Sequence, residues 1–173
     1  EYPTESAGVN HFRTLLDELN LKKQFKPNII FVDYLNLCTS ARLKHGGNIN
    51  SYSYIKAIAE ELRGLAVERN VPIFSATQVN RSGFSSTDFG LEDTSESFGL
   101  PATADFMFAL IAIDDLDKQN QILIKQLKNR YNDTFVNRKF ILEINRAKMK
   151  LSDVKKEEQS LLDANQTDEE EYG

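Results

Sequence analysis

The sequence predicts an α/β fold with a mostly parallel sheet, and three observations support this prediction. An apolar run, Ile29-Ile30-Phe31-Val32, ends at Asp33, and a second run from Val71 to Ala76 ends at Thr77-Gln78. Between the two runs lies a segment whose apolar residues have helical spacing. An unbroken apolar run indicates a strand covered on both faces, and the order strand, helix, strand favours parallel pairing.

Two segments carry apolar residues on one helical face, which predicts helices over residues 9–25 and 54–69. Pro27 is expected to end the first of them. Arg69 closes the second, just before the second strand. The apolar positions are Phe12, Leu15, Leu16, Leu19 and Leu21 in the first helix, and Ile55, Ile58, Leu62 and Leu65 in the second.

Polar segments connect these elements. Residues 39–51 and the Ser- and Gly-rich residues 81–93 are expected to form mobile surface loops, and residues 94–103 a short helix broken at Pro101. Residues 105–113, 121–128 and 135–144 follow with short connections, which predicts antiparallel or hairpin-linked strands at the end of the sheet. We therefore expect one domain over residues 1–150 and an acidic, disordered tail over 151–173.

The charge and the apolar content of the sequence limit which kinds of partner the protein can have. The 173 residues carry a net charge of −5, and this excess equals the five acids that follow Leu162, namely Asp163, Asp168, Glu169, Glu170 and Glu171. The body is therefore electrically balanced, so a nucleic-acid partner is not excluded. No apolar stretch reaches the roughly 20 residues that cross a bilayer, and no leader sequence is evident, so we expect a cytoplasmic protein without membrane contact.

Single residues add further limits. The lone Cys38 cannot form an internal disulfide and is expected to pack as a small side chain. His11 and His45 lack companions that would suggest zinc. Because residue 1 is Glu rather than Met, we expect the chain to be a fragment, a processed product or one piece of a split protein.

Asp33 and Gln78 are the first candidates for chemistry. Parallel strands collect their ligands at the carboxyl edge, so Asp33 is placed beside a nucleotide's Mg²⁺ and Gln78 where it can sense the terminal phosphate. Alternatively, Asp33 caps a turn and Gln78 binds loop backbone. The glycine-rich loop ending in Lys and Ser or Thr that cradles phosphates is absent from the sequence. The residues therefore resemble half of an ATP site.

Lys128 and Arg130 form a second candidate site at the end of a predicted strand. Two cations spaced one residue apart suit phosphate oxygens, and Arg130 can serve as an arginine finger on the ATP of a neighbouring subunit. The alternative is a solvated pair of surface cations.

The loops supply candidates for contact with single-stranded nucleic acid. Arg42, Lys44, Arg81 and the backbone around Ser95 to Gly99 can bind phosphates, and Phe84, Phe89 and Phe98 can stack on bases. Loop cations that only increase solubility are the alternative. A nuclease-type metal cluster of Asp33, Asp93, Glu96 and Asp105 is less favoured, because Asp105 opens an apolar strand and is expected to close a turn.

Taken in order, these motifs resemble the C-terminal ATPase domain of DnaB-type replicative helicases. Asp33-Tyr34-Leu35 matches the family's Asp-Tyr-Leu strand end, and Ser75 to Ser82 is similar to its Ser-Gln-x-x-Arg-Ser element. Leu91 to Asp105 resembles the DNA-facing loop, and Lys128-Asn129-Arg130 the lysine sensor and arginine finger. The resemblance covers residues 1–150. The family's usual Arg before Glu96 and Gly after Ser97 are here Ser95 and Phe98, and the catalytic glutamate of an earlier strand is absent.

The resemblance implies the later half of a RecA-like P-loop ATPase core that lacks the Walker A loop. It implies ATP and Mg²⁺ as cofactors, with Asp33, Gln78 and Arg130 as catalytic residues and Lys128, Arg130 and Gln78 near the nucleotide. Implied DNA contacts are Arg42, Lys44, Arg81, Ser95, Glu96 and Phe98. Implied partners are single-stranded DNA, five further copies in a homo-hexamer, a primase and a helicase loader.

The expected activity is ATP-driven 5′ to 3′ movement on single-stranded DNA and unwinding at the fork, with the isolated chain inactive. Two alternatives stay open. One is a RecA-like recombination or regulatory ATPase that binds single-stranded DNA. The other is a non-catalytic assembly module of a split helicase.

Overall fold

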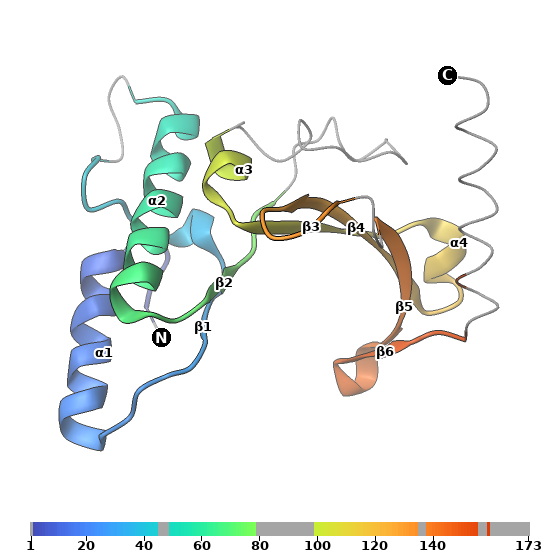
Figure 1. Cartoon of the computed structure of the whole chain (residues 1–173), viewed down its shortest axis with the longest axis horizontal. Helices are drawn as coiled ribbons and strands as arrows, with labels where there is room; N and C mark the ends of the chain where they lie inside the picture. Colours follow the sequence, from blue (N-terminus) through green and yellow to red (C-terminus); the bar gives the residue numbers. More distant parts are fainter. Residues whose placement is uncertain (1, 45–48, 79–98, 135–137, 156–158, 160–173) are drawn as a thin grey trace. The chain divides into compact units, whose positions relative to one another are not determined.

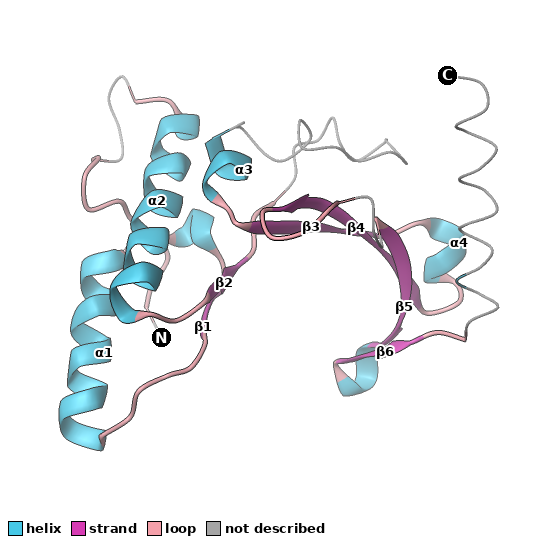
Figure 2. Cartoon of the chain, viewed as in Figure 1, coloured by secondary structure: helices cyan, strands magenta, loops and turns pink. Residues whose placement is uncertain are grey.

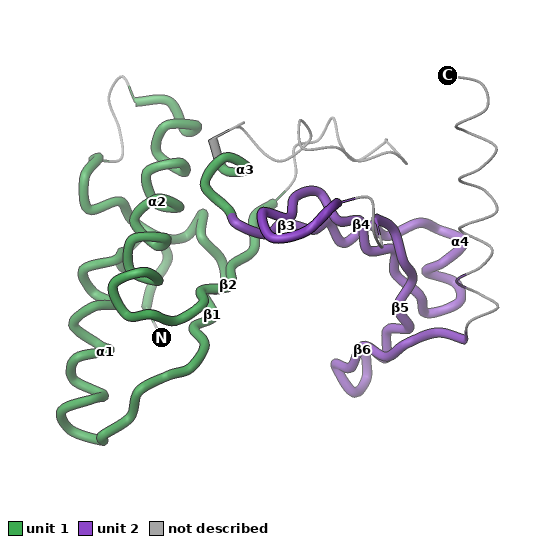
Figure 3. Tube along the Cα trace, viewed as in Figure 1, with its two compact units in different colours: residues 1–86, 90–104 green, residues 87–89, 105–173 purple. Residues whose placement is uncertain are grey.

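The computed structural model describes residues 2–44, 49–78, 99–134, 138–155 and 159 (Figure 1). These residues divide into two compact units (Figure 3). The first unit comprises residues 1–86 and 90–104, and the second comprises residues 87–89 and 105–173. Helices dominate the first unit and an antiparallel sheet dominates the second (Figure 2).

The two long helices of the first unit lie where the apolar spacing predicts them. Helix α1 spans Val9–Lys23 and ends at Gln24, which adopts the left-handed conformation. Helix α2 spans Ser51–Arg69 and begins earlier than expected, because the Asn50 side chain accepts a hydrogen bond from the Ser53 N–H at 2.9 Å and so caps the helix. The predicted apolar face of α2 forms the core of this unit, with Ile58 and Leu65 almost fully buried.

Helix α1 is less covered than its pattern predicts. Only Val9 of α1 is buried, whereas Leu15 and Leu21 remain exposed. Ion pairs join α1 to α2: Arg13 contacts Glu68 at 2.9 Å and Arg69 contacts Asp17 at 2.5 Å. The hydrogen bond from Arg69 holds the pKa of Asp17 below its ordinary value, and the hydrogen bond from Arg13 does the same for the pKa of Glu68.

Strands β1 (Ile30–Val32) and β2 (Ile73–Ser75) pair in parallel, as predicted, with Phe31 opposite Phe74. Both are shorter than the apolar runs that predict them. The expectation that the first strand is covered on both faces is wrong for the described residues, because Phe31 is 74% exposed and Phe74 47% exposed. Helix α2 contacts β2, so the pair has a helical layer, but the side that carries these two rings is open.

The segments that follow β1 and precede the second unit differ in detail from the prediction. After β1 the chain forms a 3₁₀ turn, η1 (Leu35–Leu37), followed by the buried Cys38, whose packing role is confirmed. Helix α3 (Gly99–Thr103) packs on α2 and continues through Pro101. A proline is tolerated there because N–H groups of the first helical turn have no acceptor within the helix. Residues 94–98 of the expected helix lie outside the described residues.

The second unit is a four-stranded antiparallel sheet in the order β3-β4-β5-β6. Strands β3 (Phe106–Ile111), β4 (Gln121–Asn129) and β5 (Lys139–Asn145) confirm the predicted antiparallel ending. A short helix, α4 (Asp114–Asp117), lies where the sequence predicts only a connection. Of the strand pairs described, one is parallel and three are antiparallel, so the parallel part is smaller than predicted.

Strand β6 (Lys150–Asp153) crosses the predicted start of the tail at residue 151. It follows a 3₁₀ turn, η4 (Arg146–Lys148), and pairs with residues 142–145 of β5. The Gln159 side chain then binds both the N–H and the carbonyl of Ile141, at 3.0 and 2.6 Å, where β6 no longer reaches. The sheet therefore continues past residue 150, because backbone pairing rather than apolar composition holds its last strand.

No helix among the described residues is long and apolar enough to cross a bilayer.

Candidate functional site

The parallel pairing of β1 and β2 brings their carboxyl ends to one edge, and side chains tie the two segments together there. The Leu35 N–H donates to the Ala76 carbonyl at 3.2 Å. The Thr77 hydroxyl donates to Asn36 Oδ1 at 3.0 Å. Gln78 Nε2 donates to the Tyr34 hydroxyl at 3.1 Å. The predicted sensor Gln78 is therefore bound to the residue that follows Asp33.

Asp33 offers an exposed carboxylate at this edge. Among the residues described, no group of three or more His, Cys, Asp or Glu side chains is arranged to hold a metal ion. Mg²⁺ in nucleotide sites is typically held by one or two carboxylates together with phosphate oxygens and water. A single exposed aspartate at a strand end fits that mode of binding.

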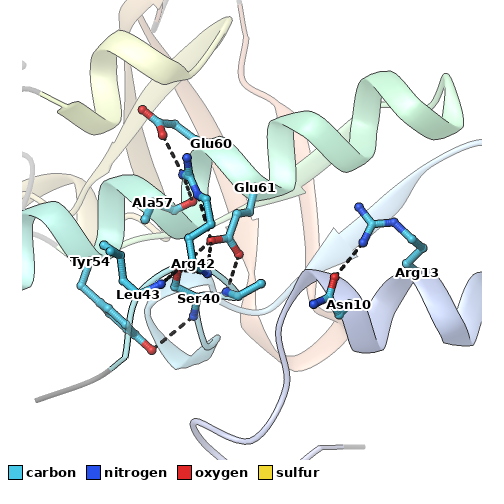
Figure 4. Close-up of polar contacts among 10 residues, drawn as sticks. Asn10, Arg13, Ser40, Arg42, Leu43, Tyr54, Ala57, Glu60 and Glu61 are labelled. Atoms are coloured by element: carbon cyan, nitrogen blue, oxygen red, sulfur yellow. Dashed lines mark hydrogen bonds and ion pairs between the residues drawn. The ribbon is translucent and has the colours of Figure 1, made fainter.

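Glu61 of α2 organises the segment that follows Cys38, and sequence reasoning missed it (Figure 4). Its side chain is only 7% exposed. It accepts hydrogen bonds from the Ser40 hydroxyl at 2.6 Å, the Ala41 N–H at 2.8 Å and Arg42 Nε at 3.3 Å. A signal was available, because Glu61 lies three residues after Ile58 and four before Leu65, on the buried stripe of the helix.

The environment of Glu61 keeps it charged. Burial raises its pKa, but the hydrogen bonds from Ala41, Ser40 and Arg42 together outweigh burial and hold the pKa below its ordinary value. The described start of the loop predicted to be mobile is thereby fastened to α2. The Tyr54 hydroxyl adds a further bond by accepting from the Ser40 N–H at 3.2 Å.

Arg42, a predicted DNA contact, already has protein partners (Figure 4). Its guanidinium contacts Glu60 at 2.7 Å and Glu61 at 3.3 Å, and donates to the Ala57 carbonyl at 3.1 Å. Two carboxylates therefore offset its charge, while Lys44, the next predicted contact, is exposed. Four further predicted DNA contacts, Arg81, Ser95, Glu96 and Phe98, lie outside the described residues.

Arg130, the predicted arginine finger, is held by Asp105 in the second unit. The Arg130 N–H donates to the Asp105 carbonyl at 2.9 Å, and Arg130 Nε contacts Asp105 Oδ1 at 3.1 Å. The Arg130 side chain is still 45% exposed. The sequence predicts only that Asp105 closes a turn, so this ion pair is an additional role. Lys128 lies within β4, opposite Met107, and is partly buried.

Comparison with known proteins identifies the relatives of this chain. Residues 4–158 match the model of the DnaB-like helicase C-terminal domain. The chain is 46% identical over 157 residues to the DnaB-like replicative helicase of Enterobacteria phage T4, covering 91% of this chain and 33% of that protein. It is 28% identical over 115 residues to the replicative DNA helicase DnaB of Mycoplasma pneumoniae, covering 65% and 24%.

Two solved structures share the fold. A DnaB-like replicative helicase, described with its interactions with primase, superposes with a TM-score of 0.69 at 22% identity, over 86% of this chain and 36% of that one. A second structure, described as an ATPase domain, gives a TM-score of 0.67 at 21% identity, over 86% of this chain and 52% of that domain.

The fold is therefore that of the RecA-like ATPase domains of helicases. The chain belongs to the family of DnaB-like helicase C-terminal domains. It spans about a third of the length of the T4 relative.

Proposed function

We propose that this chain is the later part of an ATP-hydrolysing motor domain that works in a homo-hexameric replicative helicase on single-stranded DNA. The observation that carries the proposal is the shared edge at which Asp33 follows β1, and at which Gln78, bound to Tyr34, follows β2. The family match, which covers both residues, supports it. In this proposal the ring moves 5′ to 3′ and parts the duplex ahead of it.

Each residue of the site has a distinct role in the proposed chemistry. ATP with Mg²⁺ supplies the triphosphate whose terminal bond is broken. Asp33 would hold the ion at this edge, and Gln78, which is bound to Tyr34, would lie on the side of the terminal phosphate. Arg130 and Lys128 place positive charge against the phosphates of a neighbouring subunit, where negative charge grows during transfer.

The proposed DNA contacts are Lys44 together with Arg42, Arg81, Ser95, Glu96 and Phe98. Lys44 is exposed beside the segment that Glu61 anchors, which supports its availability to a phosphate. Because Arg42 is paired with two carboxylates, its contribution to DNA affinity should be smaller than that of Lys44. A primase and a helicase loader complete the proposed partners, and the solved relative described with primase supports the first of them.

The decisive experiment uses rings assembled from this chain and the rest of its domain, with DNA-stimulated ATP hydrolysis as the readout. Arg130→Ala should lower turnover by on the order of 10³-fold, as removal of arginine fingers does. Arg146→Ala is the matched control, because Arg146 is an exposed arginine of the same unit that pairs with Asp117. Unchanged turnover in Arg130→Ala would refute the proposed role of Arg130.

Mixed rings test whether the site is shared between subunits. Asp33→Ala protomers keep Arg130, and Arg130→Ala protomers keep Asp33, so mixing the two inactive forms creates some interfaces with both residues intact. Partial recovery of hydrolysis is expected on mixing. No recovery at any ratio would mean that Arg130 serves the nucleotide of its own subunit.

A separate experiment distinguishes a motor from a recombination ATPase. The wild-type ring is tested for unwinding of a fork substrate and for strand exchange, and the motor proposal expects unwinding.

A further inference from the structure

We propose that the turn between strands β5 and β6 binds the end of a DNA duplex, with Met149 covering the last base pair and the flanking Lys148 and Lys150 contacting phosphates. These three residues are called here the hairpin tip. The inference rests on the proposed function, because it adds a duplex contact to a chain proposed to act on DNA. It concerns only the second unit, in which both strands of the hairpin and the turn between them are described.

The hairpin tip presents an apolar side chain between two cations. Met149 is 95% exposed, more than any other large apolar side chain in the described residues. Lys148 and Lys150 are exposed as well, and neither forms an ion pair within the part of the chain that the structure describes. The two acids of the hairpin, Glu143 and Asp153, pair with Ser152 and Leu142 at the end away from the turn. Proteins use cations to hold DNA phosphates and apolar side chains to pack against bases.

Hydrogen bonds and an ion pair hold the backbone of the hairpin tip in place (Figure 2). The Asn145 side chain accepts from the Lys148 N–H at 3.0 Å, and the Met149 N–H donates to the Arg146 carbonyl at 3.3 Å. Arg146 in turn pairs with Asp117 of α4. A side chain carried by a fixed backbone loses less conformational freedom on binding, which favours affinity.

The backbone conformation at Met149 is unusual for a methionine. Its φ is 47° and its ψ is 48°, in the left-handed region that favours glycine. A glycine would therefore form the same turn with less strain, so the turn itself does not require methionine. Because the side chain is also almost fully exposed, it contributes little to the folded core. Backbone strain of this kind is found most often at functional sites.

A duplex end fits this combination better than an acidic polypeptide does. The two lysines suit either partner, but acidic groups give no reason for an apolar side chain between the lysines. Within a duplex each base pair is covered by its neighbours, whereas the last pair exposes one apolar face that a methionine can cover. The phosphates of both strands lie at the edge of that face, within reach of cations on either side. The proposed motor meets such an end at a fork.

Fork binding tests the role of Met149. Rings assembled from this chain and the rest of its domain are held with a non-hydrolysable ATP analogue, and their affinities for a fork and for single-stranded DNA are measured. Met149→Gly should weaken fork binding by about 10-fold, the scale of one partly buried apolar side chain, and should change single-strand binding by less than about twofold. Met149→Leu keeps an apolar side chain and should bind forks within about threefold of wild type. Since glycine suits the left-handed turn, Met149→Gly should not lower the thermal unfolding midpoint.

Salt dependence tests the two lysines. In the double variant Lys148→Gln, Lys150→Gln, the slope of log affinity for the fork against log salt should become shallower by about 1.8, or roughly 0.9 for each lost phosphate contact. The matched control is Lys23→Gln, Lys26→Gln, which removes two exposed lysines of the first unit and should leave the slope unchanged. In wild-type rings, 4-thiothymidine in the last base pair of the fork should cross-link to the peptide that contains Met149.

Two results would overturn the proposal. One is equal fork affinity of the wild type and Met149→Gly. The other is an equal loss of affinity for forks and for single strands, since the hairpin tip would then contact single strands. Failure of the motor proposal is a different result, in which fork binding depends on the hairpin tip but the ring does not part the duplex when ATP is supplied.

Discussion

Among single residues, Glu61 combines near-complete burial with a retained charge. A carboxylate leaves water at a high cost unless hydrogen bonds replace its hydration, and here the donors come from three consecutive residues, Ser40 to Arg42. The helix thus holds the segment that leaves the candidate site. Neighbouring Glu60 is exposed, and its ion pairs within the described part of the chain are with Arg42 and Lys56. We therefore expect the two adjacent acids to contribute differently to the free energy of unfolding.

Replacement of Glu61 should reveal that difference. Glu61→Gln is expected to cost about 1–3 kcal/mol of unfolding free energy near neutral pH, because it removes a charged acceptor from a buried cluster. Glu60→Gln should cost less than about 1 kcal/mol, as exposed ion pairs do. Urea unfolding of both variants measures the contrast, and equal losses would show that Glu61 does not anchor the segment.

Glu61→Gln should also differ from the wild type in how the free energy of unfolding depends on pH. The pKa of Glu61 is lowered in the folded state, so its charge contributes stability above the unfolded value of roughly 4.3 and loses that contribution as the pH falls through the lower folded value. Wild-type stability should therefore drop more steeply below about pH 4.3 than that of Glu61→Gln. Urea unfolding at several pH values gives the free energy of unfolding for both proteins. If this free energy fell equally with pH in the wild type and in Glu61→Gln, the lowered pKa would be contradicted.

Asp105 is expected to position Arg130, if Arg130 acts as proposed. In assembled rings, Asp105→Asn should lower kcat for ATP by roughly 10- to 100-fold with little change in KM, because a displaced guanidinium stabilises the transition state less. Asp115→Asn serves as control, because it alters an aspartate of the same unit that is also paired with a cation, Lys118, but is far more exposed than Asp105. A rise in KM at constant kcat would assign Asp105 to binding rather than to positioning.

Among the helices and strands, two glycine positions at the long helices of the first unit differ in whether they have room for a larger side chain. Gly8 caps α1 and bridges to Thr39, and a Cβ at Gly8 would lie 2.1 Å from the Thr39 carbonyl oxygen. Gly64 lies within α2, and a Cβ there meets nothing within 4 Å. The first position therefore requires glycine for close backbone approach, whereas the second has no steric need for it.

Alanine at each position tests this contrast. Gly64→Ala should stabilise the protein by about 0.5–1 kcal/mol through helix propensity. Gly8→Ala should destabilise it by about 1–3 kcal/mol, because the backbone of residue 39 must move away. Thermal unfolding followed by far-ultraviolet circular dichroism gives both shifts. A stabilising Gly8→Ala would show that the bridge between Gly8 and Thr39 is not required.

Helices were easier to anticipate than strands, for a local reason. Apolar spacing along the chain predicts the bodies of α1 and α2. Their observed ends are set by Gln24 and Asn50, each of which lies next to the helix that it caps, and the prediction did not use these two residues. The strand ends and β6 depend on pairing with other segments. Lys150–Asp153 has little apolar character, yet it forms a strand because β5 offers an open edge.

Considered as a whole, the chain should not hydrolyse ATP by itself. Its 173 residues contain no glycine-rich loop ending in Lys and Ser or Thr, so the backbone cradle and the lysine that hold the phosphates have no counterpart in it. Phosphate release from the purified chain should equal that of buffer, and should rise when the complementary part is co-assembled. Hydrolysis by the purified chain that disappears in Asp33→Asn would overturn this expectation.

Residue types and short-range spacing were sufficient to predict the family-specific motifs, the two long helices, the parallel order of β1 and β2 and the antiparallel ending. All of these features depend on patterns of residues that lie close to one another in the sequence. Four features became evident only once the chain was folded: Glu61 fastens residues 40–42, Asp105 binds Arg130, Tyr34 binds Gln78, and Phe31 and Phe74 face water. Each is a contact, or a missing contact, between segments distant in sequence, and folding is what brings such segments together or leaves them apart.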